Sequence, residues 1–201
     1  MSDLDLKNQQ NLPELEAAVK EMVEAGVFYG RRKSKTHPRM KVNVLHNRNG
    51  VEVINLHRTK DALVVAMDFI RAKVGNGGNA LLVATQPAVR DLVEGLAKEL
   101  DIPYVSKRWI GGTLTNSKGI FKRIEYFKKL KKDLAEGAFE KYTKKERLGL
   151  EKEAERLEEL FGGVAELSRL PDFIITIDPA MHKIAVAEAI QCKIPVVAFA
   201  N

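Results

Sequence analysis

The residues best suited to chemistry stand in one short run between residues 107 and 116. The run holds two cations, the single tryptophan, two glycines, two threonines and an asparagine, in the order Lys107-Arg108-Trp109-Ile110-Gly111-Gly112-Thr113-Leu114-Thr115-Asn116. Cations can neutralise phosphates, glycines allow close backbone approach through N–H donors, and short polar side chains can bond ribose or phosphate oxygens. The run therefore predicts phosphate and ribose contacts. A structural interpretation is also open, in which Trp109 anchors the helical hairpin that follows onto the domain while the glycines make the bend. Both interpretations hold together if Trp109 is structural and Lys107 and Arg108 contact phosphate.

A second basic segment extends from Arg31 to Arg48. It contains seven cations and no acid: Arg31, Arg32, Lys33, Lys35, Arg39, Lys41 and Arg48. This segment alone exceeds the net charge of the whole chain, which is +6. Nine further cations against one acid lie between Tyr104 and Lys132, so the rest of the chain is net negative. Such segregation is typical of a surface that binds a polyanion, although solvated basic loops and one charged helix would give the same pattern.

Catalytic arrangements find little support. A dinucleotide site needs a glycine loop after its strand, but Gly75–Gly78 precedes a predicted strand and Thr85–Pro87, which follows it, has no glycine. Ser106 and Ser168 lack the glycine-flanked elbow of a nucleophilic serine. Asp178, followed by proline, is interpreted as a helix cap. We therefore expect no enzyme and no cofactor.

Metal, membrane and secretory signals are equally weak. The four histidines are scattered along the sequence, and a single cysteine, Cys192, excludes an internal disulfide and a four-cysteine zinc site, so no metal site is expected. Cys192 stands among apolar residues and is expected to be a buried, inert thiol. No apolar run approaches the roughly 20 residues of a membrane span, and the first residues do not form a signal peptide. These observations predict a cytoplasmic protein.

The predicted elements alternate between helix and strand. A helix from Pro13 to Gly26 precedes an irregular basic stretch, and two short strands then flank an Asn-Gly turn. The later elements are a helix capped by Thr59, strands at 80–84 and 102–105 around a helix at 87–100, and strands at 172–177 and 194–200 around a helix that Asp178 and Pro179 begin. This alternation predicts an α/β fold with a parallel, Rossmann-like or flavodoxin-like sheet.

The segment 118–161 interrupts the alternation. Apolar residues recur at helical spacing in two arms, and Thr143–Glu146 has the pattern of a capping box that opens the second arm. Each arm has a narrow apolar stripe, which predicts a protruding antiparallel helical hairpin, or coiled coil, whose basic and acidic arms pair through their charges. The expected division is an α/β domain made of 1–117 and 162–201, with 118–161 inserted.

Residues Arg108–Asn116 closely resemble the Arg-Trp-Leu-Gly-Gly-x-Leu-Thr-Asn signature of the bacterial-type small-subunit ribosomal protein two family. Further landmarks agree in order: Asn47-Arg48-Asn49-Gly50, Val53-Ile54-Asn55-Leu56, Leu170-Pro171-Asp172, Ile177-Asp178-Pro179, Ala185, Glu188-Ala189 and Ile194-Pro195. The resemblance implies a structural constituent of the small ribosomal subunit. It further implies binding to small-subunit ribosomal RNA between head and body near the messenger exit, and docking of ribosomal protein one.

On this hypothesis the partners are ribosomal RNA and neighbouring ribosomal proteins, with no membrane and no small-molecule substrate. The candidate phosphate contacts are Arg31, Arg32, Lys33, Lys35, Arg39, Arg48, Lys107 and Arg108. Weaker polar candidates are Asn47, Asn49, Thr113, Thr115 and Asn116. Two other hypotheses stay open: an α/β enzyme or sugar-phosphate-binding domain near Thr85 and Asp178, and a hairpin that serves as an adaptor arm for a protein.

The departures from the family pattern are informative. The family's Gly-x-His-Phe-Gly-His appears as Gly26-Val27-Phe28-Tyr29-Gly30-Arg31, so metal binding that those histidines support in relatives is not expected here, and Arg31 adds a cation. The family's Asn-Pro-Lys-Met appears as His37-Pro38-Arg39-Met40, which keeps the positive charge. Relatives continue past the position of Asn201 through an Asp-Thr-Asn segment and a helix, so an incomplete C-terminus is expected.

Overall fold

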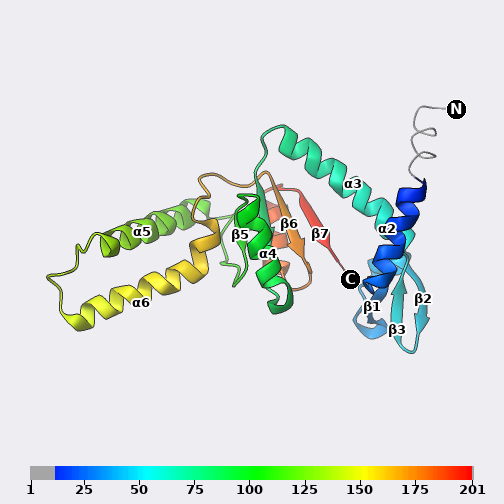
Figure 1. Ribbon diagram of the computed structural model, residues 1–201, viewed down its shortest axis with the longest axis horizontal. Helices are drawn as coiled ribbons and strands as arrows, with labels where there is room; N and C mark the ends of the chain where they lie inside the picture. The colour runs from blue at the N-terminus through cyan, green and yellow to red at the C-terminus, as the bar shows by residue number, and fades with distance from the viewer. Residues whose placement is uncertain (1–11, 201) are drawn as a thin grey trace. The chain divides into compact units, whose positions relative to one another are not determined.

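The computed structural model describes residues 12–200, and the chain divides into two compact units (Figure 1). The first unit extends to Ala72 and the second runs from Lys73 to Ala200. The boundary falls inside helix α3, which spans Leu56–Gly75. Each unit has a sheet of its own, and the two sheets differ in strand direction.

The first unit carries a small antiparallel sheet. Its elements are helix α2 (Leu12–Glu24), strand β1 (Tyr29–Arg32), the 3₁₀ turns η1 (Lys33–Lys35) and η2 (Pro38–Asn43), and strands β2 (Val44–Arg48) and β3 (Val51–Ile54). The strand order is β1-β3-β2. The predicted Asn-Gly turn joins β2 to β3: Asn49 and Gly50 both have positive φ, and the Gly50 N–H donates to Asn47 Oδ1 at 3.0 Å. This is the backbone that a two-residue hairpin requires.

Strand β1 corrects the prediction that the stretch after α2 is irregular. It pairs antiparallel with β3, with Tyr29 opposite Val53 and Arg32 opposite Val51. Its sequence, Tyr-Gly-Arg-Arg, has no apolar alternation, so the pattern gave no signal of a strand. Gly30 is needed for the pairing because a Cβ there would lie 2.7 Å from the Glu52 carbonyl oxygen.

Helix α3 begins one turn earlier than predicted. The Asn55 Oδ1 atom accepts from the backbone N–H groups of His57 at 3.1 Å and Arg58 at 3.4 Å, so Asn55 is the cap. The Thr59 hydroxyl donates to the Asn55 carbonyl at 3.2 Å, a bond made inside the helix. Leu56 is buried, and its burial holds this first turn in place.

The second unit contains the predicted parallel sheet, with strand order β5-β4-β6-β7. The strands are β4 (Ala80–Val83), β5 (Tyr104–Val105), β6 (Phe173–Ile177) and β7 (Val196–Phe199), and the crossover helices are α4 (Pro87–Glu99) and α7 (Lys183–Gln191). The steps β4 to β5 and β6 to β7 run in opposite directions. Right-handed crossovers then place α4 and α7 on opposite faces, which agrees with a Rossmann-like core.

Helix α7 begins later than predicted, at Lys183, so Asp178 is not its cap. Asp178 has a positive φ of 59°. Its carboxylate accepts from the Ala180 N–H at 3.1 Å and from Gln86 Nε2 at 3.0 Å. The Asp-Pro pair therefore forms a turn after β6, and Asp178 ties that turn to the loop after β4.

Helices α5 (Ser117–Ala135) and α6 (Lys144–Phe161) lie side by side and run in opposite directions (Figure 1). The predicted capping box is confirmed: the Thr143 N–H donates to Glu146 Oε2 at 2.9 Å, and the Glu146 N–H donates to Thr143 Oγ1 at 3.4 Å. The two helices are expected to pair through their charges, and one ion pair between them has this form: Lys131 Nζ lies 2.6 Å from Glu158 Oε2.

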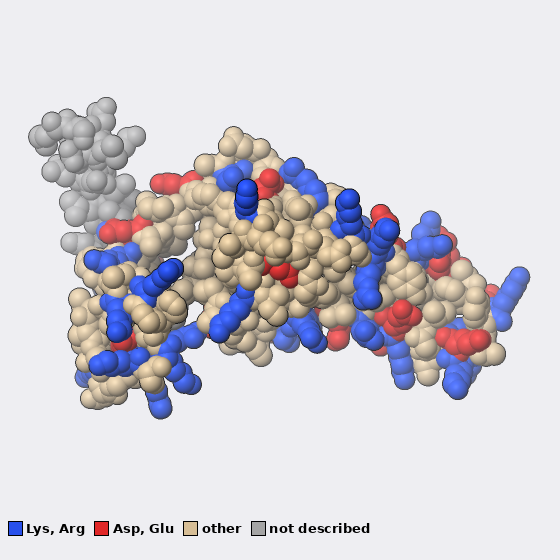
Figure 2. All heavy atoms as spheres, turned by 180° about the vertical axis from the view of Figure 1, so that it is seen from behind, with Lys and Arg blue, Asp and Glu red and all other residues tan. Residues whose placement is uncertain are grey.

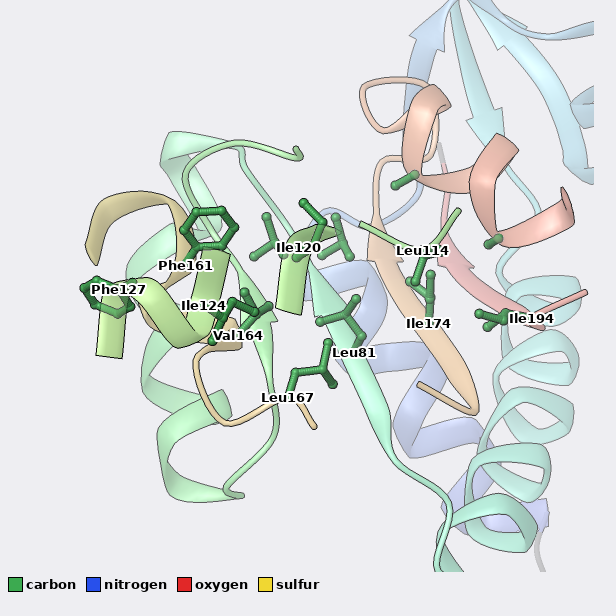
Figure 3. Close-up of a cluster of buried hydrophobic side chains, with 14 of the residues drawn as sticks. Leu81, Leu114, Ile120, Ile124, Phe127, Phe161, Val164, Leu167, Ile174 and Ile194 are labelled. Atoms are coloured by element: carbon green, nitrogen blue, oxygen red, sulfur yellow. The ribbon is translucent and has the colours of Figure 1, made fainter. Parts of the chain in front are cut away.

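The core of the second unit is continuous from these helices to the sheet (Figure 3). Phe127 and Phe161 fill the space where α5 meets α6, and Ile120 and Ile124 extend the cluster toward Leu81. On the α7 side, the cluster includes Leu114, Ile174 and Ile194, with Ala185 and Ala189 of α7 itself. Cys192 is a half-buried free thiol packed against the same cluster.

Candidate nucleic-acid interface

The basic segment from Arg31 to Arg48 lies along β1, the two 3₁₀ turns and β2. Six of its seven cations are exposed, and Arg31 is half-buried. Within residues 12–200, none of the six lies within ion-pair distance of a carboxylate: Arg32, Lys33, Lys35, Arg39, Lys41 and Arg48. On the face in Figure 2, Lys and Arg dominate the charged surface of the first unit, whereas acids and bases are mixed over α5 and α6. The first unit thus offers cations that are available to an external anion.

Arg31 has a different environment from its neighbours. It lines a small cavity together with Thr36, Asn43 and Glu52. Glu52 is 6% exposed, and its Oε2 atom has no hydrogen-bond partner among the described residues. Arg31 is half-buried and already interacts within the protein, so it is a weaker candidate for a phosphate contact than the six exposed cations.

The other basic site, the run 107–116, is in the loop that joins β5 to α5. Lys107 and Arg108 are exposed at its start, and Thr115 and Asn116 are exposed at its end. Thr113 is 5% exposed, and its hydroxyl donates to the Ile110 carbonyl at 2.6 Å. The loop therefore presents its cations to solvent while its middle is turned inward.

The middle of this loop closes around one carboxylate, that of Glu188 on α7. Glu188 Oε1 accepts from Trp109 Nε1 at 3.0 Å and from the Gly112 N–H at 2.8 Å. Glu188 Oε2 accepts from the Leu114 N–H at 3.0 Å and from the N–H and hydroxyl of Thr115, both at 3.3 Å. The expectation that the loop's backbone donors serve a phosphate is corrected: three of them are used inside the protein.

These contacts confirm the anchoring role predicted for Trp109. Its indole N–H reaches Glu188, and its ring is half-buried against the hydrophobic core. Gly112 takes a φ of +90°, which L-residues rarely adopt, and the bend predicted from the glycines is located there.

Glu188 is the residue that sequence reasoning missed as a site residue. Burial alone would raise the pKa of its carboxyl group, but hydrogen bonds from Trp109, Gly112, Leu114 and Thr115 outweigh that effect and lower the pKa below its ordinary value of 4.5. Its signal in the sequence was an acid within the otherwise apolar run 184–190, on the core-facing stripe of a helix.

The carboxyl end of the parallel sheet, where the enzyme hypothesis looked for a site, is internally bonded. Gln86 joins Asp178, as described above, and the Thr85 N–H donates to His182 Nε2 at 3.4 Å. His182 is 4% exposed, and burial lowers its pKa against the opposing charge of Asp178. Within the described residues, no group of three or more His, Cys, Asp or Glu side chains could hold a metal ion.

Together these features define a mixed α/β protein with a Rossmann-like core and exposed cations on a small sheet and one loop. The sequence model of the family Ribosomal protein S2 matches residues 22–201. Three curated relatives, each called Small ribosomal subunit protein uS2, come from the Dehalococcoides mccartyi strains 195, BAV1 and CBDB1. Each is 38% identical over 183 residues, which cover 91% of this chain and 75% of the relative. The chain belongs to the ribosomal protein S2 family.

Family membership gives the chain a structural role in the small ribosomal subunit, and so places it in the cytoplasmic ribosome. The family is one of ribosomal structural proteins and is not known as a family of enzymes. None of the helices in residues 12–200 is both long enough and apolar enough to cross a membrane.

Proposed function

We propose that this chain binds small-subunit ribosomal RNA through the exposed cations of residues 31–48 and through Lys107 and Arg108. The observation that carries the proposal is the run of seven cations without an acid, six of them exposed on β1, β2 and the turns between them. The like charges of such a surface repel one another, and a bound polyanion relieves that repulsion.

The mechanism is electrostatic. Each Lys or Arg that meets a phosphate releases condensed counterions, so affinity falls steeply as salt rises. Specificity comes from shape and from 2′-hydroxyl contacts more than from base edges. The proposed contacts are Arg32, Lys33, Lys35, Arg39, Arg48, Lys107 and Arg108, with Arg31, Asn47, Asn49, Thr115 and Asn116 in supporting positions. Thr113 is buried, so we assign it a structural role.

The resemblance extends the proposal to a place in the subunit. We propose that the chain lies between head and body near the messenger exit, where it supports docking of ribosomal protein one. We also propose that 118–161 is a coiled-coil arm inserted into an α/β RNA-binding domain made of 1–117 and 162–201. The hydrophobic core that α5 and α6 share supports the proposal of an arm. Four cations on α5 have no ion pair within the described residues: Lys118, Lys122, Arg123 and Lys129.

The test is incorporation into small subunits that lack their own copy of this protein. Labelled chain is mixed with the depleted subunits, and co-sedimentation is measured across a salt series. We expect wild-type chain to co-sediment at low salt and the double variant Lys107→Glu, Arg108→Glu to bind at least about tenfold more weakly while keeping its far-UV circular dichroism.

The matched control is Lys144→Glu with Lys145→Glu. It makes the same change in charge at two adjacent exposed lysines at the start of α6. Equal loss in the two double variants would mean that net charge, and not the loop, determines binding. Unchanged binding of the loop variant would exclude the loop as an RNA contact, and failure of the wild-type chain at low salt would reject the proposed function.

A further inference from the structure

The loop from Trp109 to Thr115 is folded around an anion that the protein supplies itself. Five donors converge on the two carboxylate oxygens of Glu188: the indole N–H of Trp109, the backbone N–H groups of Gly112, Leu114 and Thr115, and the Thr115 hydroxyl. We call this arrangement the Glu188 nest. It joins α7 to a loop more than 70 residues away in the chain.

Only an acceptor fits the centre of this nest. An ionised carboxylate has acceptor sites on both oxygens and no hydrogen to donate. A glutamine of the same size would turn its NH₂ group against backbone donors, and an apolar residue would leave several buried donors unpaired. Glu188 is 7% exposed, so water cannot readily replace its carboxylate. The charge of Glu188, and not its volume alone, is therefore required by the loop.

The nest lies between the two parts of the loop that face outward. Lys107 and Arg108 directly precede Trp109, and Asn116, directly after Thr115, leads into α5. Leu114 is 2% exposed and belongs to the hydrophobic core, so the bonds to Glu188 and the packing of Leu114 hold the same few residues. The nest thus fixes the chain directly after the two cations, while Ser106, directly before them, is fixed by a bond from Arg90 Nε at 3.1 Å and a bond to Glu94 Oε1 at 2.6 Å.

We propose that Glu188 is a positioning residue for RNA binding, whose carboxylate holds the loop in the shape that presents Lys107 and Arg108 to phosphate. This inference rests on the proposed function, because it assumes that the two cations meet RNA. Glu188 itself does not touch the RNA. It acts in the place that a phosphate would take in a glycine-rich loop, and the phosphates are left to the cations outside.

Chemical rescue tests the role of the charge. Glu188→Ala removes the atoms of an acetate ion from a site lined with donors, so added acetate can refill it, whereas chloride at equal ionic strength cannot make the same bonds. Glu188→Gln keeps the site filled and should not respond to acetate. Glu159→Gln, which removes an exposed carboxylate from α6, is the control for loss of one negative charge.

Trp109 is the only tryptophan, so its fluorescence reports on the nest directly. We expect Glu188→Ala and Glu188→Gln to shift the Trp109 emission to longer wavelength, and acetate to reverse the shift in Glu188→Ala alone. Incorporation into depleted subunits should fall about tenfold in both variants and recover with acetate in Glu188→Ala alone. Glu159→Gln should match the wild type in both measurements.

Several outcomes would overturn the proposal while leaving the proposed function intact. Unchanged Trp109 emission in both variants would show that the nest does not hold the loop. Changed emission with normal incorporation would show that loop shape does not govern RNA binding. Loss of far-UV circular dichroism in both variants would make Glu188 a determinant of the whole fold. If wild-type chain does not bind the subunits, the proposed function fails, while the fluorescence still decides whether the nest exists.

Discussion

Single polar atoms decide the shape of the loop 107–116 more than its glycines do. Gly112 permits a φ of +90°, but the path of the chain on either side of it follows the donors that reach Glu188. The hydroxyls of Thr113 and Thr115 donate to Ile110 and Glu188, so both also serve the loop. Lys107 and Arg108 are exposed to solvent, and the hydrogen bonds of the residues that follow them fix the shape of the loop.

Glu188 makes a prediction about pH. Its pKa is lowered in the folded chain, so its stabilising contribution is complete above the ordinary value of 4.5 and is lost as the pH falls from 4.5 through the folded-state value. We expect the free energy of unfolding of the wild type to fall over this acid range. Glu188→Gln should start lower at pH 7 and show a smaller fall.

Urea unfolding at a series of pH values, followed by circular dichroism, measures this difference. Glu159→Gln is the control and should keep the wild-type dependence on pH. Parallel curves for wild type and Glu188→Gln would contradict the prediction, because they would show that Glu188 releases no stability on protonation.

At the scale of the elements, the short 3₁₀ turn η3 (Gly162–Val164), at the C-terminal end of α6, packs closely against strand β5. It follows α6 directly and packs against β5, and Val164 is part of the core that Phe161 begins. Gly163 is the point of closest approach: a Cβ there would lie 2.3 Å from the Tyr104 carbonyl oxygen. The backbone of η3 therefore contacts the backbone of β5 directly at the C-terminal end of α6, and any side chain at position 163 would prevent this contact.

Two glycine substitutions test this element. Gly163→Ala should lower the free energy of unfolding by about 1–3 kcal/mol, because β5 or η3 has to move. Gly149→Ala, inside α6 with nothing within 4 Å of the added Cβ, should raise it by about 0.5–1 kcal/mol. Urea unfolding of the two variants measures both. A neutral Gly163→Ala would mean that η3 is free to shift away from β5.

For the whole molecule, charge is distributed to match the proposed partner. The first unit concentrates exposed cations, whereas lysines of α5 form ion pairs: Lys128 with Glu166, which follows η3, at 2.9 Å, and Lys131 with Glu158 of α6 at 2.6 Å. Exposed ion pairs of this kind add little stability. Within the described residues, these pairs engage Lys128, Lys131 and Lys132 of α5. The six exposed cations of residues 31–48, together with Lys107 and Arg108, lie in no such pair in the described part of the chain, so we assign the proposed RNA contact chiefly to them.

The salt dependence of binding follows from this distribution. Replacing Arg32, Lys33 and Lys35 by alanine should reduce the slope of log K against log salt by about 2–3, since each lost phosphate contact removes about 0.7–0.9. The matched control replaces Lys144, Lys145 and Lys152, three exposed lysines of α6, and should leave the slope unchanged. The sedimentation assay across a salt series measures both slopes. An unchanged slope in the first variant would show that these cations meet no phosphate.

The sequence by itself determined the features that depend on neighbouring residues. Apolar periodicity predicted the helices, the Asn49-Gly50 pair predicted the β-hairpin, and the pattern Thr143–Glu146 predicted the capping box. All three features depend on contacts between residues a few positions apart. The separation of charge and the family resemblance are also properties of the chain as written. For the candidate RNA interface, by contrast, the sequence could only propose which cations and polar residues contact RNA, without the hydrogen bonds that hold them in position.

Tertiary structure alone decided what distant residues do to one another. Strand β1 exists because β3 pairs with it, and the strand order of the parallel sheet depends on crossovers that periodicity does not encode. Asn55, and not Thr59, caps α3, and the first turn that it caps carries the buried Leu56. The role of Glu188 required α7 to meet the loop 109–115, since a buried carboxylate is identified by the donors that surround it and those donors lie far away in the sequence.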